Sequence, residues 1–156
     1  MPRIRSFLAS FKAAGRGVLD TIDRERNMRF HLVAMVSVLY LAGYYPFTQT
    51  QQAVLYLTIA AVISLELVNT AIETTVDLCC PRQHPLAKRA KDAAAGGVLV
   101  AAIAAVFVGI RLFWQPEILL SVWTDFVTHP IKLVLLAAFA AAGIWFIFFW
   151  KENNKK

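Results

Sequence analysis

The chain has 156 residues, of which 58% are hydrophobic and 17% are charged; its mean hydropathy is +0.57 and its formal net charge is +6. This composition excludes an ordinary soluble domain of this length and predicts a small, all-α integral membrane protein. The positive charge does not indicate a nucleic-acid partner, because the basic residues lie beside apolar runs, where anionic lipid headgroups balance them. They also lack the interleaved aromatic residues of a strand-binding groove.

The first predicted element is an amphipathic helix over about residues 3–25. Its apolar side chains recur at steps of three and four, with charged residues between them: Ile4, Phe7, Leu8, Phe11, Val18, Leu19 and Ile22. This is the pattern of a helix that lies in the membrane surface. A simple interfacial anchor explains the apolar stripe, but it does not explain the charged segment DRERNMRFH at residues 23–31.

Four apolar segments follow, over about residues 30–47, 53–80, 93–113 and 131–150. Each has roughly 18 residues or more, which is near the length that a hydrocarbon core of ~30 Å requires of a helix. Seven basic residues precede the first segment, four lie between the second and third, and three follow the fourth. The positive-inside rule therefore predicts a multi-pass protein with both termini in the cytoplasm.

The second predicted span carries a polar face. Steps of three, four and four residues place its polar side chains together on a helix: Glu66, Asn69, Glu73 and Asp77. The loop that follows brings Lys88, Lys91 and Asp92 to the same membrane depth as Glu73. Acids inside a membrane cost on the order of a few kcal/mol and are functional candidates by default. Acids that hold a divalent cation, beside bases that hold phosphate, suit phosphoryl transfer.

The same charges also fit two alternatives to phosphoryl transfer. The acids and bases can form interhelical salt bridges, or the buried carboxylates can serve a proton-coupled carrier. No P-loop, kinase-type glycine loop or zinc-protease motif is present to indicate a nucleotide or a metal. The third span adds a ridge of small residues that allows close helix packing, within the chain or between subunits: Ala93, Gly97, Ala101, Ala105 and Gly109.

Three segments resemble the signature blocks of the prokaryotic diacylglycerol kinase family. They read AGRGVLDTIDRERNMRFH, ELVNTAIETTVDL and HPLAKRAKDAAAGGV. Their residues resemble the undecaprenol kinase branch more than the diacylglycerol kinases of Gram-negative bacteria. The resemblance covers about residues 6–111 and implies a homotrimer in the bacterial inner membrane, with active sites between neighbouring chains near the cytoplasm. It also implies a kinase domain of three spans over residues 1–111, to which residues 112–156 add a fourth span and a basic tail.

The resemblance implies a role for eight residues. Glu66 matches the catalytic base that takes a proton from a lipid hydroxyl, and Asn69 matches the amide that orients this group. Glu25 and Glu73 match the acids that bind Mg²⁺ bridging the ATP phosphates. The other matches lie around the nucleotide: Lys91 and Asp92 face it, Arg16 lies near its phosphates, and His84 lies near its adenine end.

The sequence therefore predicts a kinase that uses ATP and Mg²⁺ to phosphorylate a membrane lipid alcohol, with undecaprenol as the first expected acceptor. No headgroup-specific motif separates this acceptor from diacylglycerol, whose phosphorylation makes phosphatidic acid. A non-enzymatic small membrane protein or carrier is the alternative outside catalysis. The fourth span has Trp145, Trp150 and Lys151 as an interfacial anchor and no ionisable residue inside it beyond Lys132 at its margin, so we expect it to pack on the outside of the bundle.

Overall fold

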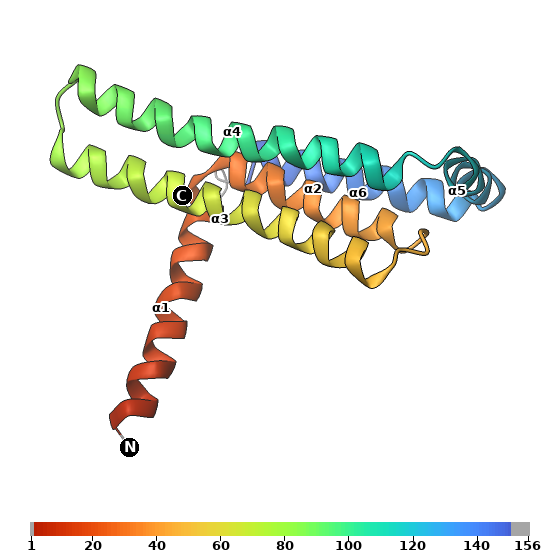
Figure 1. The fold of residues 1–156 in the computed structure, drawn as a ribbon, viewed down its shortest axis with the longest axis horizontal. Helices are drawn as coiled ribbons and strands as arrows, with labels where there is room; N and C mark the ends of the chain where they lie inside the picture. Colours follow the sequence, from red (N-terminus) through yellow and green to blue (C-terminus); the bar gives the residue numbers. More distant parts are fainter. Residues whose placement is uncertain (1, 151–156) are drawn as a thin grey trace.

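The computed structural model describes residues 2–150, with side chains from residue 7 onward; the basic tail, residues 151–156, lies outside the described residues. Within that range the chain folds into six helices: α1 (Pro2–Arg24), α2 (Arg26–Ala42), α3 (Gln49–Cys79), α4 (Pro85–Phe113), α5 (Pro116–Thr128) and α6 (Pro130–Phe148). Figure 1 shows α2, α3, α4 and α6 running along one common axis, whereas α1 leaves this bundle at a steep angle. The predicted all-helical fold is confirmed.

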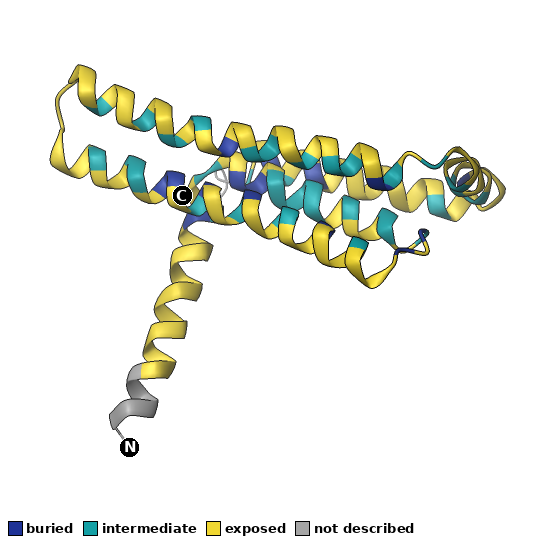
Figure 2. Cartoon of the chain, viewed as in Figure 1, coloured by how far each residue is buried: buried dark blue, intermediate teal, exposed yellow. Residues whose placement is uncertain are grey.

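Three of the helices are long and apolar enough to cross a membrane: α3, α4 and α6. They correspond to the second, third and fourth predicted spans. Only 28% of the most apolar stretch of α3 is buried inside the chain, and the shares for α4 and α6 are 6% and 11%. Most of the apolar surface is therefore exposed, as Figure 2 shows, and this suits a protein whose solvent is lipid.

The first predicted span is shorter than expected at its C-terminal end. Helix α2 has 17 residues and ends at Ala42, and residues 43–48 form a loop. Pro46 disfavours a helical conformation of the preceding Tyr45. The Tyr45 hydroxyl instead donates a hydrogen bond to the carbonyl of Phe113, at 2.9 Å, and its ring stacks on Phe47. The loop is thus packed against the end of α4. Because α2 is not among the helices long and apolar enough to cross a membrane, the predicted four crossings stay a prediction.

Helix α5 was not predicted. It lies at the end of the bundle opposite the α3–α4 loop, and Figure 1 shows it almost end-on, across the direction of α4 and α6. Pro116 and Pro130 occupy the first turns of α5 and α6, where proline is favoured. Asp125 of α5 accepts hydrogen bonds from Lys132 of α6 and from the hydroxyl of Tyr44. These contacts join α5 to the α2–α3 loop and to α6.

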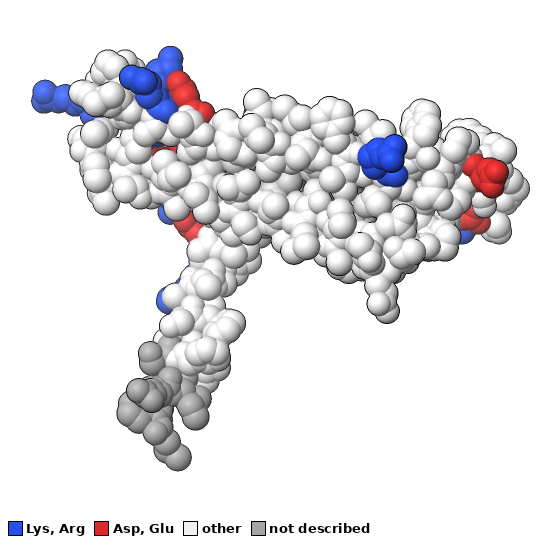
Figure 3. Space-filling model, viewed as in Figure 1, with Lys and Arg blue, Asp and Glu red and all other residues white. Residues whose placement is uncertain are grey.

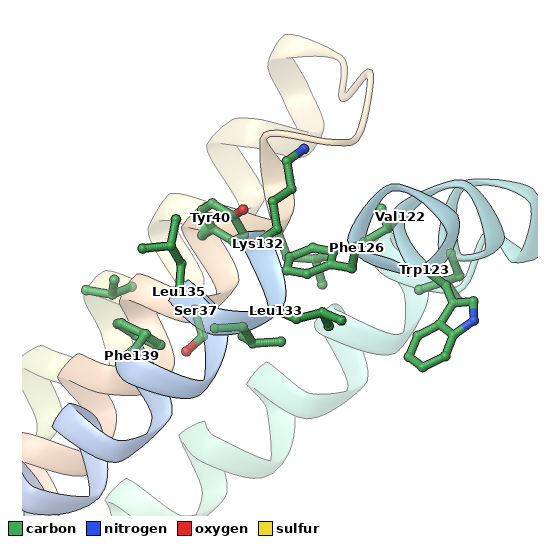
Figure 4. A pocket seen from close by; sticks show the side chains of 13 residues that line it. Ser37, Tyr40, Val122, Trp123, Phe126, Lys132, Leu133, Leu135 and Phe139 are labelled. Carbon is green, nitrogen blue, oxygen red and sulfur yellow. The ribbon is translucent and has the colours of Figure 1, made fainter. Parts of the chain in front are cut away.

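An apolar hollow of about 550 Å³ lies between α2, α5 and α6. Figure 4 shows Tyr40, Phe126 and Lys132 around one end of it and Phe139 farther along α6. Charged side chains are sparse along the middle of the bundle and gather toward its ends, as Figure 3 shows on one face. A wide uncharged band between two charged ends is the surface expected of a chain that spans a bilayer.

Candidate active site

Glu66 lies on the inner face of α3, where its side chain is 1% exposed. The carboxylates of Glu25 and Glu73 both interact electrostatically with it. Within residues 7–150, none of these three acids forms a salt bridge. No interhelical salt bridge within the described residues therefore accounts for Glu66 or Glu73. The buried carboxylate of Glu66 needs a cation or a proton to balance its charge.

Asn69 links two of the predicted site residues. It is buried one turn from Glu66 on the same helix, and its amide nitrogen Nδ2 donates a hydrogen bond to Oε1 of Glu73, at 2.9 Å. Its oxygen Oδ1 is buried and accepts no hydrogen bond from the described residues. A buried polar atom without a partner is uncommon, and this oxygen is free to accept a hydrogen bond from a water or a ligand.

Glu25 reaches the site from a different part of the chain. It is the extended residue between α1 and α2, and its side chain caps neither helix. Its backbone N–H donates to the carbonyl of Thr21, at 2.8 Å, and its own carbonyl accepts from the N–H of Arg29, at 3.3 Å. Figure 1 shows this α1–α2 junction meeting the bundle part-way along α3. Glu25 is close enough to interact electrostatically with Glu66 of α3, which lies 41 positions later in the sequence.

The acids do not form a complete metal site by themselves. In the described part of the chain, no three His, Cys, Asp or Glu side chains are close enough to hold a metal ion. Mg²⁺ is usually bound by one or two carboxylates together with substrate phosphates and water. Glu25, Glu73 and the oxygen of Asn69 are ligands of the chemical type that Mg²⁺ prefers.

A second group of predicted site residues lies at the loop between α3 and α4. A pocket of about 740 Å³ opens there, and its lining includes His84 and Lys91 together with Arg82 and Lys88. His84 caps α4 by accepting a hydrogen bond from the N–H of Leu86. Lys91 forms a salt bridge with Asp77 of α3, so an interhelical salt bridge does exist for this pair.

Two predicted residues lie apart from this arrangement. Arg16 is on the part of α1 where every side chain from residue 7 to residue 20 is exposed. Asp92 is exposed on α4 and is not part of the lining of the loop pocket. The structure therefore brings together Glu25, Glu66, Asn69 and Glu73, and groups His84 with Lys91, while it leaves Arg16 and Asp92 outside both groups.

Sequence reasoning missed two buried polar residues beside the acids. Thr70 lies next to Asn69 on α3, and its hydroxyl donates to the carbonyl of Glu66, at 3.0 Å. Arg29, near the start of α2, belongs to the charged segment 23–31, but no individual role was predicted for it; its side chain is 4% exposed. Its closeness along the chain to the candidate acid Glu25 was the signal available in the sequence.

An apolar groove of about 310 Å³ lies along the bundle, and its lining on α3 stops one turn before Glu66. It runs between α2, α3 and α4, and its lining includes Val62 and Ile63, one turn before Glu66, as well as His31 of α2. Ala105 and Gly109 of the small-residue ridge on α4 also line it. Along α3, the polar loop pocket therefore lies on one side of Glu66 and the apolar groove on the other.

The sequence profile of the family described as prokaryotic diacylglycerol kinase matches residues 12–113. The chain belongs to this family. It is 44% identical over 110 residues to the undecaprenol kinase of Bacillus subtilis, an alignment that covers 70% of this chain and 89% of that relative. It is 45% identical over 118 residues to a diacylglycerol kinase of Synechocystis, covering 75% and 67%. The diacylglycerol kinase of Escherichia coli is 31% identical over 112 residues, covering 70% and 92%.

Membership of this family confirms the predicted activity class: the protein is a lipid kinase of the membrane, and its relatives imply the use of ATP. The matched region ends at the end of α4, so it contains all the residues of the candidate site. Helices α5 and α6 follow this region.

Proposed function

We propose that this kinase transfers the γ-phosphate of ATP to the hydroxyl of undecaprenol. One observation carries the proposal: a buried carboxylate without a cationic partner among the described residues, Glu66, lies just beyond an apolar groove between three membrane helices. A lipid alcohol whose tail occupies this groove places its hydroxyl near Glu66. The relationship to the undecaprenol kinase of Bacillus subtilis, at 44% identity over most of that protein, supports the choice of acceptor.

The chain's own residues supply the acid–base chemistry. Glu66 acts as the general base and takes the proton of the lipid hydroxyl, while the hydroxyl oxygen attacks the γ-phosphorus and ADP leaves. Asn69 holds Glu73 through its amide nitrogen, and its buried Oδ1 accepts a hydrogen bond from a bound water or substrate group. The surrounding helices exclude bulk water, so the activated oxygen meets the phosphate and not a solvent proton.

Glu25 and Glu73 are proposed to hold Mg²⁺ when the nucleotide is bound, and this ion would neutralise the charge of the ATP phosphates. His84 and Lys91 would line the nucleotide pocket at the α3–α4 loop, where four basic or potentially basic residues gather. The roles of Arg16 near the phosphates and of Asp92 facing the nucleotide are proposals that rest on the family resemblance. A tilt of α1 toward the bundle would be needed for Arg16 to reach the phosphates.

The proposed setting is the bacterial inner membrane, with both termini in the cytoplasm and the kinase assembled as a homotrimer. The charge pattern of the loops supports this orientation, because basic residues concentrate before α2, between α3 and α4, and after α6. A domain boundary near residue 111 is also proposed, with residues 1–111 forming the kinase domain and 112–156 a peripheral addition. The exposed surface of α4 supports assembly, since little of this helix is buried by its own chain.

The decisive experiment is the transfer of radiolabel from ATP to purified lipids. Undecaprenol and diacylglycerol are offered separately in the same mixed micelles, with the Glu66→Gln variant as the blank. We expect a faster initial rate with undecaprenol. A clear preference for diacylglycerol would assign the alternative acceptor, and a failure to label either lipid, with intact folding, would favour a carrier or structural protein.

A further inference from the structure

The buried guanidinium of Arg29 connects three helices. Its Nη1 donates hydrogen bonds to the carbonyls of Ile22, at 2.9 Å, and Asp23, at 3.1 Å. Its Nε and Nη2 both donate to the carbonyl of Ile147, at 3.3 Å. These carbonyls belong to the last turns of α1 and α6, where a helix has no acceptor partners of its own and its dipole attracts a cation. One side chain of α2 thus caps two other helices.

Further contacts fasten α6 to the same place. The indole N–H of Trp150 donates to a carboxylate oxygen of Asp23, at 3.0 Å, and the guanidinium of Arg26 lies 5.8 Å from the centre of the Phe148 ring. Farther along α6, Gly143 lets this helix approach α2 closely, because a Cβ on Gly143 would lie 3.2 Å from a methyl group of Val33. The fourth predicted span is therefore packed directly on the α1–α2 junction.

The junction is where α1 is held. From residue 7 to residue 20 all side chains of α1 are exposed, whereas Thr21 and Met28 on either side of the junction are buried. Along the chain, Glu25 lies between Asp23, whose carbonyl accepts a hydrogen bond from Arg29, and Arg29 itself. A change in the packing of this corner would move both α1 and the carboxylate of Glu25.

We infer that Arg29 is a positioning residue and that the end of α6, through Arg29, holds the α1–α2 junction so that Glu25 faces the polar side of α3. The role of Glu25 in this inference rests on the proposed function. Ile147 and Trp150 lie outside the region matched by the family, so α6 is an added brace for the nucleotide side of the site. This differs from a span that only covers the outside of the bundle.

Full-length variants test the inference in two ways. Gly143→Leu pushes α6 away from α2 without touching the junction, and Ala142→Leu adds a similar volume at the neighbouring exposed position as its control. Arg29→Gln removes the cation, Arg29→Lys keeps the charge but not the fork of donors, and Arg111→Gln is the control for loss of an exposed arginine.

Two measurements are made on each variant: the Mg-ATP concentration that gives half-maximal rate, and hydrogen exchange of the backbone amides of residues 21–29. We expect Gly143→Leu and Arg29→Gln to raise the KM for Mg-ATP by about five-fold or more, the effect of losing roughly one good hydrogen bond. The fall in kcat should be smaller than the rise in KM. Exchange at the junction should accelerate, Arg29→Lys should be intermediate, and both controls should match the parent.

The double variant identifies the path of the effect. Both substitutions break the contact between Arg29 and the end of α6. The fold-change in KM of the double variant, Gly143→Leu combined with Arg29→Gln, should therefore be clearly smaller than the product of the fold-changes of the two single variants. Unchanged KM and unchanged exchange in Gly143→Leu would overturn the inference, and so would fully multiplicative effects. If Arg29→Gln does not fold, Gly143→Leu and Arg29→Lys decide it. If the parent labels no lipid, the proposed function fails, while the exchange data still decide the link between α6 and the junction.

Discussion

Replacing Glu66 by glutamine separates catalysis from structural support. Glutamine keeps the shape of the side chain but cannot take a proton, so turnover should fall by about 10²- to 10⁴-fold, the usual contribution of a general base. This loss corresponds to roughly 3 to 5 kcal/mol in the activation barrier. Breaking a buried salt bridge would instead lower stability by about 3 to 5 kcal/mol. Glu66 is 1% exposed and forms no salt bridge within residues 7–150, so the thermal stability of the variant should stay unchanged or rise.

The assay measures thermal unfolding, Mg-ATP binding and lipid phosphorylation of parent and variant in one detergent. Glu117→Gln, at an exposed position in the first turn of α5, is the matched control and should behave as the parent in all three. Glu66→Gln should still bind the nucleotide, because Glu25 and Glu73 remain. Turnover within tenfold of the parent would remove Glu66 as the base, and a lower unfolding temperature would show that it has a cationic partner in the assembled protein.

Three further changes test the remaining parts of the molecule. Glu73→Gln should weaken Mg-dependent ATP binding, with activity partly restored by added magnesium; a magnesium dependence identical to the parent's would remove this ligand. A chain that stops after Gln115 should keep measurable kinase activity but unfold at a lower temperature and need more Mg-ATP, and complete loss of activity in a folded truncation would show that the added helices complete the site. The hydrogen bond from Lys132 holds the pKa of Asp125 below its ordinary value of 3.8. A lowered pKa means that this contact stabilises the fold above the ordinary value and that the stabilisation is lost as the pH falls through the lowered one. Asp125→Asn should therefore flatten the acid limb of the unfolding temperature measured from about pH 5 to 2.

The helical period was enough to find the polar face of the candidate site. Any helix that contains Glu66, Asn69 and Glu73 places them on one side, at steps of three and four residues, whatever packs against it. Length and hydropathy likewise indicated α3, α4 and α6, because the requirement to bury a long apolar segment in lipid is a local property of the segment. The three signature segments indicated the family, which the profile match over residues 12–113 confirmed.

The sequence pattern did not show where the first span ends or that α5 exists. Pro46 is a local signal for the end of α2, but the loop that follows is also held by a hydrogen bond from Tyr45 to Phe113, 68 positions later in the chain. Helix α5 is held in place by Asp125, whose partners Tyr44 and Lys132 belong to two other segments. Such boundaries are set by contacts between distant residues and carry no periodic signal of their own.

The pairing of charges also had to come from the folded chain. Asp77 and Glu73 occupy the same face of α3, yet Asp77 is neutralised by Lys91 while Glu73 is held by the amide of Asn69. Arg29 resembled any other basic residue at a membrane surface until the fold placed it against Ile147, 118 positions away. The sequence shows that a side chain is charged, but the residue that pairs with it depends on which helix ends meet in the folded chain. For Arg29 this arrangement decides that the side chain is a buried contact between helices and not a solvated cation.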